Sequence, residues 1–289
     1  MEERANAVIY TGARPVFIDS HPDYWCIDPE DAERKVTERS KAIIAVHSYG
    51  HPCDMDRILK LANRHGLYVV EDCAEAHGAE YKGRKVGSFG NISCFSFYGN
   101  KIITTGEGGM CLTNDQNLAK KMRILRDHGM DPKRKYWHDV VGFNYRMTNL
   151  QAALGVAQLE KIEYFISRKR EVAELYNDLF KGFEEIICPP EMPWAKNVYW
   201  LYSILIDNSK TNIGRDKLMK ALEKERVETR PLFYPIHEMP PYKKYSHGGC
   251  PVAEKISRMG LSLPSSAKLQ DEEVRLIIDI IIKSLRMYT

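Results

Sequence analysis

Lys101 and Asp72 are the residues of this chain whose surroundings best suit covalent chemistry. Lys101 follows an apolar run that starts at Ser93 and precedes the glycine-rich turn 106–109, beyond which a second apolar run covers 110–112. Two strands joined by such a loop would hold the lysine at a fixed place. Asp72 ends another apolar run. Together they indicate a site for an aldehyde cofactor, in which the amine forms a Schiff base and the acid keeps a ring nitrogen protonated.

Each of these features also has a purely structural explanation. A lysine in a loop is usually a solvated charge, and an acid at a strand end is often a helix N-cap. The run 106–109 by itself marks a turn, and it is no nucleotide-binding loop because no Gly-Lys-Ser/Thr follows it. The order and spacing of several motifs are needed to choose between these explanations.

The first third of the chain alternates apolar strands with helices. Strands are predicted at 16–19, 42–47 and 68–72, with one helix starting at Asp28-Pro29 and another covering 54–65. Apolar runs without polar alternation are typical of a mostly parallel sheet that is covered on both faces. Ligands of such sheets bind beyond the carboxyl ends of the strands, where Asp72 lies.

The predicted sheet and its helices form the start of a large domain. The remainder of the chain is predicted to complete this domain and then to form a smaller one. Thr148 has capping-box spacing and is expected to start a long helix that runs towards Leu179. The other predicted elements are a helix at 117–127, a strand at 199–206, a helix at 216–224, a strand at 228–233 and a closing helix at 272–287. Prolines at 189, 190 and 193 mark the boundary, so we predict domains at 1–185 and 186–289.

Composition excludes several classes of function. The 289 residues, 44% of them hydrophobic, suffice for one large and one small domain. A net charge of +3 from 42 basic and 39 acidic residues gives no reason to expect nucleic acid, although it suits an anionic substrate. No run is long enough to span a membrane, and the N-terminus is not a signal peptide. Seven irregularly spaced cysteines favour reduced thiols in the cytoplasm, and they form no metal-ligand spacing with His47 and His77.

The ordered motifs resemble the DegT/DnrJ/EryC1/StrS family of sugar aminotransferases, which use pyridoxal 5'-phosphate. The resemblance is carried by six segments, at 50–56, 70–75, 95–101, 104–109, 142–149 and 230–237. It implies an α/β fold of the aspartate aminotransferase type (the PLP-dependent transferases of fold type I). In that fold a large domain with a mostly parallel sheet precedes a smaller α+β C-terminal domain.

The same resemblance implies five cofactor-binding residues. Lys101 would be the catalytic residue, which binds the aldehyde and, once released, shuttles a proton, while Asp72 would bind the ring nitrogen. Glu75 would lie near the ring hydroxyl and Ser96 would bind the phosphate, although a surface acid and a packed serine are the alternatives. Asn144 would reach the phosphate of a neighbouring subunit, which implies a homodimer with shared active sites.

Arg230, Tyr234 and His237 match positions that contact substrate in the family. An arginine suits a nucleotide diphosphate through forked hydrogen bonds, but Arg230 precedes a proline and could equally be a surface residue. The implied reaction moves an amino group from an amino acid, glutamate, to a nucleotide-linked keto-6-deoxy sugar, with GDP-4-keto-6-deoxymannose as the specific substrate expected. A dehydratase branch of the family needs histidine at the position of Lys101, so the lysine argues against it.

The chain departs from the family at its start. In the family a substantial segment precedes the region that resembles Ala5-Asn6-Ala7-Val8, and it carries a phosphate-binding turn at a helix start and an aromatic ring that stacks on the pyridine. Neither feature is found before Ala5. Loss of the helix-terminus amides would weaken phosphate binding. The alternative to an active enzyme is therefore a truncated, non-catalytic relative that keeps only the fold or partner binding.

Overall fold

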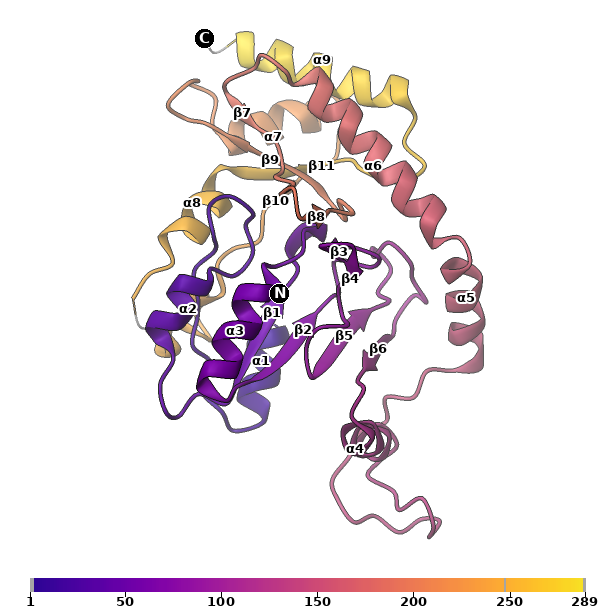
Figure 1. The fold of residues 1–289 in the computed structure, drawn as a ribbon. Coiled ribbons are helices and arrows are strands. Elements are labelled where there is room, and N and C mark those ends of the chain that lie inside the picture. The colour runs from indigo at the N-terminus through magenta and orange to yellow at the C-terminus, as the bar shows by residue number, and fades with distance from the viewer. Residues whose placement is uncertain (1–2, 247, 288–289) are drawn as a thin grey trace.

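The computed structural model describes residues 3–246 and 248–287, and its central element is a four-stranded sheet (Figure 1). The strands are β1 (Ala42–Val46), β2 (Tyr68–Asp72), β5 (Ile92–Ser96) and β6 (Gly109–Leu112), in the order β1-β2-β5-β6. The first three are parallel and β6 is antiparallel to β5. This confirms the predicted mostly parallel sheet. Asp72 pairs with Cys94, so Ser96 ends β5 at the same sheet edge as Asp72.

Local capping chemistry explains where the first helices begin and end. α2 (Pro29–Lys35) starts after Asp28, whose carboxylate accepts a hydrogen bond from the Glu30 amide. α3 (Met55–His65) has Asp54 as its N-cap and ends at Gly66, which adopts the left-handed conformation with φ of 63°. Both helices were predicted from these residues, and α3 buries Ile58 and Leu61 against β1 and β2.

The predicted strand at 16–19 is wrong. The segment has no regular secondary structure and pairs with no strand in the described part of the chain. The Asp19 amide instead donates to the Asp31 carboxylate at 2.7 Å, and the Asp19 carbonyl accepts from the Asp28 amide at 2.9 Å. A side chain and a turn therefore satisfy backbone groups that a neighbouring strand would otherwise have bound.

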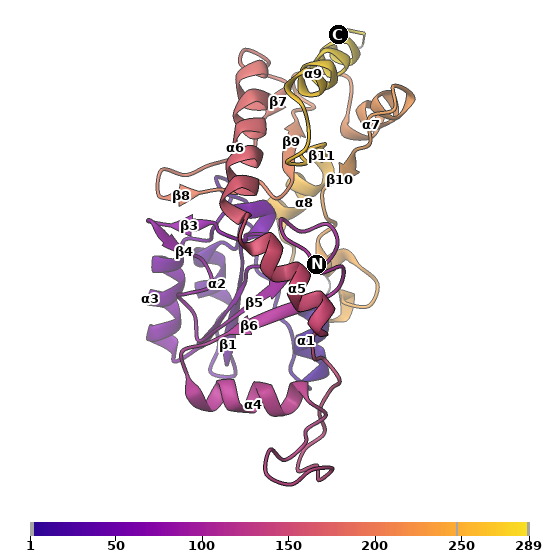
Figure 2. The same cartoon turned by 90° about the vertical axis from the view of Figure 1, so that its right-hand side faces the viewer.

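The predicted long helix after Thr148 is two helices. α4 (Gln116–Arg126) is followed by α5 (Asn149–Leu159) and α6 (Ile162–Leu179), which run end to end along one side of the molecule (Figure 2). The break lies at Lys161, whose φ of −108° and ψ of 7° are not helical. The predicted capping box at Thr148 is confirmed, because its hydroxyl accepts from the Gln151 amide.

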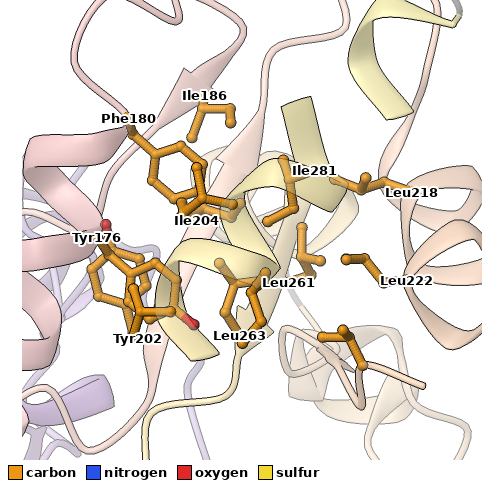
Figure 3. Packing of buried hydrophobic residues seen from close by; sticks show 14 of the residues in the cluster. Tyr176, Phe180, Ile186, Tyr202, Ile204, Leu218, Leu222, Leu261, Leu263 and Ile281 are labelled. Atoms are coloured by element: carbon orange, nitrogen blue, oxygen red, sulfur yellow. The ribbon is translucent and has the colours of Figure 1, made fainter. Parts of the chain in front are cut away.

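A second, antiparallel sheet lies in the C-terminal part of the chain. Its strands are β7 (Ile186–Ile187), β9 (Tyr202–Ile206), β10 (Arg230–Pro231) and β11 (Gly260–Leu263), in the order β10-β11-β9-β7. It shares a hydrophobic core with α6, α7 (Arg215–Lys224) and α9 (Asp271–Arg286), shown in Figure 3. This core begins at Val172 inside α6, whereas the predicted division at 185/186 lies after that helix.

The C-terminal part also contacts the N-terminal part of the chain. α8 (Pro251–Met259) presents the amides of Val252 and Ala253 to the carboxylate of Asp19, at 3.1 and 2.9 Å. A small sheet of β3 (Glu80–Tyr81), β4 (Arg84–Lys85) and β8 (Ala195–Lys196) makes another connection. α1 (Glu3–Tyr10) is held by Asn6, which accepts a hydrogen bond from the Tyr242 hydroxyl.

The described part of the chain also contains three short 3₁₀ helices, η1 (Ser48–Gly50), η2 (Ile236–Glu238) and η3 (Lys243–Tyr245). Among the described residues, no helix combines the length and the apolar character that crossing a membrane requires.

Candidate active site

Lys101 lies in the connection between β5 and β6, as the glycine-rich sequence predicts. Ser96 pairs with Gly109 at the open end of the two strands. Within the connection the Lys101 amide donates to the Tyr98 carbonyl at 3.0 Å, and the Thr105 amide donates to the Phe97 carbonyl at 2.9 Å. These bonds fold the loop back on itself and leave Lys101 half-buried at the edge where β2 and β5 end.

Asp72 and Glu75 form a pair of poorly hydrated carboxylates at this edge. Their side chains are 15% and 4% exposed, and both bind the guanidinium of Arg4 from α1, Asp72 through Nε and Glu75 through Nη2 at 3.1 Å. Burial acts to raise the pKa of Asp72, but the Arg4 charge and the Ala74 amide outweigh it and hold that pKa below its usual value. The pair is therefore built to bind a planar cation.

The amine of Lys101 packs against an aromatic surface. Its Nζ lies 3.9 Å from the centre of the Trp200 ring, a cation–π contact, and the Trp200 indole donates to the Asn100 carbonyl at 2.8 Å. Trp200 stacks on Phe233 with ring centres 6.3 Å apart, and Phe233 stacks on Tyr49 at 5.4 Å. Because the Tyr49 amide donates to Glu75 at 2.9 Å, this aromatic row links Lys101 to the acid pair.

The pKa of the buried His77 depends on the charges of both Lys101 and Asp72. Its ring is only 3% exposed and lies beside Phe95 and Phe97, at 5.5 and 5.9 Å between ring centres. Burial, and after it the Lys101 ammonium, lower the pKa of His77 to about 4, while Asp72 opposes that shift. The pKa of this one imidazole thus responds to both the predicted amine and the predicted acid.

Ser96 and Asn144 occupy different environments. The Ser96 hydroxyl accepts from the Tyr98 amide at 3.3 Å and stands at the carboxyl end of β5. Asn144 is exposed, in an isolated bridge with Asp127, and no described contact joins it to Asp72 or Lys101. The structure therefore brings Lys101, Asp72, Glu75 and Ser96 to one sheet edge and leaves Asn144 facing outward.

The three predicted substrate residues do not form one cluster. Arg230 and Tyr234 are exposed, and the Arg230 guanidinium lies 3.3 Å from Glu228. His237 is buried, with its Nε2 3.0 Å from a carboxylate oxygen of Glu254. A role of these residues in binding substrate stays a prediction.

Comparison with known proteins identifies the fold and the chemistry. Residues 4–282 match the DegT/DnrJ/EryC1/StrS aminotransferase family. The chain belongs to this family. It is 47% identical over 277 residues to a GDP-perosamine synthase of Escherichia coli O157:H7, covering 96% of this chain and 74% of the relative. GDP-perosamine synthases of Caulobacter vibrioides and Vibrio cholerae are 45% and 42% identical, covering 95% and 96% of this chain and 74% and 75% of theirs.

Solved structures of sugar aminotransferases have the same fold. Streptomyces venezuelae DesV, solved with a ketimine intermediate, superposes with a TM-score of 0.91 at 34% identity, covering 98% of this chain and 75% of that one. Helicobacter pylori PseC, an aminotransferase of pseudoaminic acid biosynthesis, gives 0.94 at 30% identity, covering 100% and 78%. The predicted family, the α/β transferase fold of type I and the use of pyridoxal 5'-phosphate are thereby confirmed.

The acid pair of this aminotransferase fits its cofactor. A protonated pyridine is a planar cation with one N–H donor, and Asp72 and Glu75 hold a planar cation in the structure. Lys101 supplies an amine at the same sheet edge. No sequence signal pointed to Arg4, Tyr49 or Trp200, and Phe233 was given no role although it lies in the segment 230–237, because each reaches the site from a distant part of the chain.

Glu71, next to Asp72 in the sequence, has a structural task in this aminotransferase. It is buried and accepts hydrogen bonds from the amides of Gly87, Phe89 and Gly90 at 2.7, 2.7 and 2.6 Å. Its fourth donor is His47 Nε2 at 3.2 Å, since His47 Nδ1 already accepts from the Cys53 amide. These bonds account for the closeness of His47 and Glu71, and Cys73 lies beside them as the second residue after Glu71.

Proposed function

We propose that this aminotransferase moves an amino group from glutamate to GDP-4-keto-6-deoxymannose and so forms GDP-perosamine for O-antigen polysaccharide biosynthesis. The observation that carries the proposal is the 42–47% identity to three GDP-perosamine synthases over 95–96% of the chain. Identity of this extent, with lysine kept at position 101, favours an active enzyme over a non-catalytic relative. The seven free cysteines support the proposal that the enzyme functions in the reducing cytoplasm.

The cofactor roles follow from charge and position. Asp72 would accept the ring N–H and keep the ring cationic, and Glu75 would bind near the ring hydroxyl. Ser96, at the end of β5, would bind the phosphate. When bound, the cofactor supplies an aldehyde that condenses with amines and a ring that accepts electron density from the reacting carbon.

Lys101 has two tasks. Its Nζ would condense with the aldehyde, with loss of water, and the amine, once released, would act as general base and then general acid for the proton of the reacting substrate carbon. Trp200 supports both tasks, because its ring face offers the ammonium a defined resting place 3.9 Å away.

The sugar nucleotide is proposed to bind at the open side of this edge. Arg230 and Tyr234 are exposed and so can meet a solvated diphosphate, which suits the forked donors of an arginine. His237 is also proposed to take part in substrate binding, although it is buried and Glu254 engages its Nε2 in the structure.

We further propose that the active sites are completed in a homodimer. Asn144 is exposed and could serve the phosphate of a second subunit. Close to it in the sequence, α5 buries none of its residues, and Leu150 and Leu154 are 86% and 46% exposed. Exposed apolar side chains gathered on one helix are typical of an interface.

The test is a transamination assay. The protein is incubated with pyridoxal 5'-phosphate, glutamate and GDP-4-keto-6-deoxymannose, and 2-oxoglutarate is measured. We expect keto-sugar-dependent 2-oxoglutarate from the wild type and none from Lys101→Ala. Turnover with keto sugars of other nucleotides but not with this one would refute the substrate assignment, and no turnover with any keto sugar would refute the enzymatic proposal.

A further inference from the structure

Each of the four carboxylate oxygens of Asp72 and Glu75 already accepts a hydrogen bond, two of them from Arg4. The Ala74 amide binds Oδ1 of Asp72 at 3.0 Å, and Arg4 Nε binds Oδ2. In Glu75, Oε1 binds Arg4 Nη2 at 3.1 Å and Oε2 binds the Tyr49 amide at 2.9 Å. Two of these four donors come from the fixed backbone and two from one flexible side chain.

The arginine is held as a cation by these contacts. Burial opposes its charge, but the two carboxylates more than compensate and raise the pKa of Arg4 above its usual value. Its side chain is 14% exposed, so water screens the ion pairs only weakly. A second cation at the same oxygens would meet like-charge repulsion from the guanidinium and would have to share oxygens that already accept hydrogen bonds.

We propose that Arg4 competes with the cofactor, because its guanidinium occupies the carboxylate oxygens that the protonated ring nitrogen needs. This inference rests on the proposed role of Asp72. Seating the ring requires Arg4 to withdraw, so the N-terminal helix α1 sets the affinity of the site for pyridoxal 5'-phosphate. The withdrawal involves a side chain at the start of the helix, while Asn6 and Tyr242 keep α1 in place.

The size of the effect follows from a simple equilibrium. The apparent dissociation constant equals the intrinsic constant divided by the fraction of molecules in which the pair is open. If Arg4 is seated about nine-tenths of the time, removing it tightens cofactor binding about tenfold.

Equilibrium dialysis of pyridoxal 5'-phosphate against the cofactor-free protein measures this affinity without any turnover. Arg4→Ala and Arg4→Gln are compared with wild type and with Arg39→Ala, which removes one positive charge at an exposed position. We expect both Arg4 variants to bind about tenfold more tightly and Arg39→Ala to match the wild type. Circular dichroism identifies any variant that fails to fold, and the glutamine variant keeps a donor of similar reach.

Chemical rescue makes the test specific to the guanidinium. Methylguanidinium added to Arg4→Ala should refill the acid pair and weaken cofactor binding towards the wild-type value, whereas it should have little effect on the wild type. Equal affinities of the wild type and both Arg4 variants would overturn the inference and leave the proposed function standing. Absence of binding to all four proteins would instead refute the cofactor site itself, and the inference with it.

Discussion

At the scale of single residues, the site holds opposite charges in a poorly hydrated place. Asp72 stays ionised because Arg4 and the Ala74 amide outweigh the cost of burial. For His77 the balance is reversed, because burial and the Lys101 ammonium outweigh the opposing charge of Asp72 and keep its ring neutral. The chain thus maintains an anion, a cation and a neutral imidazole within one site, and each depends on its neighbours for its protonation state.

His77 should make stability fall in mildly acidic solution. Its pKa is lowered from 6.5 to about 4 in the folded protein, so between these values only the unfolded chain binds the proton. Folding stability is therefore complete above about pH 6.5 and is lost as the pH falls towards 4, by about 3 kcal/mol in total. Carboxylates with lowered pKa values, such as Asp72, act below this window because their stabilising effect is lost only as they are protonated.

Urea unfolding of the wild type and His77→Phe at several pH values measures this contribution. The variant should lose less stability than the wild type between pH 6.5 and 4. Parallel pH profiles of the two proteins would show that the histidine is not responsible.

At the scale of elements, turns and caps set the position of the catalytic loop. The Glu71 carboxylate accepts hydrogen bonds from three backbone amides of the turn 87–90, which precedes β5. Gly50 is needed where η1 meets the segment before β9, because it has φ of 106° and a Cβ there would lie 2.7 Å from the Tyr199 nitrogen. These contacts locate β5 and Trp200, the two supports of Lys101.

Glu71→Gln should destabilise the protein strongly. A glutamine retains one acceptor oxygen but turns an NH₂ group towards backbone donors, and His47 loses its charged partner. We expect a loss of about 3–5 kcal/mol in the free energy of unfolding, as for a broken buried pair. The measurement is the urea midpoint, with the exposed Glu38→Gln as control. A midpoint for Glu71→Gln that matches this control would contradict the structural role.

Local signals determined which elements could be predicted. Asp54 and Gly66 set the two ends of α3, and both ends could be predicted because an N-cap and a left-handed glycine act on the backbone within a few residues. The strand predicted at 16–19 failed because strand formation depends on a partner elsewhere in the chain. The aromatic row escaped prediction for the same reason, since Tyr49 meets Phe233 across 184 residues.

At the scale of the whole molecule, the described part of the chain leaves the apolar helix α5 exposed to solvent. α5 buries no residue, although Leu150, Leu154, Val156 and Leu159 all lie on it and are exposed. The hydrophobic core around β9 and β11 is by contrast made of buried side chains that pack on one another (Figure 3). The asymmetry agrees with the proposal that a second subunit covers the side of the molecule that carries α5.

A charge on α5 should therefore disrupt self-association. We expect the wild type to elute as a dimer in size-exclusion chromatography with light scattering, and Leu150→Lys/Leu154→Lys to shift towards monomer. Leu276→Lys is the matched control, because Leu276 is a 60% exposed leucine on the distant helix α9. A dimer that survives the α5 changes, or a wild type that is monomeric at all concentrations, would exclude this interface.

The central claim concerns one amine, and borohydride reduction tests it most directly. The protein is incubated with pyridoxal 5'-phosphate, reduced and digested, and the modified peptide is identified by mass spectrometry. The account predicts a phosphopyridoxyl group on Lys101, a near-visible absorbance band that reduction abolishes, and loss of both in Lys101→Ala. A label on other lysines with Lys101 unmodified would contradict it.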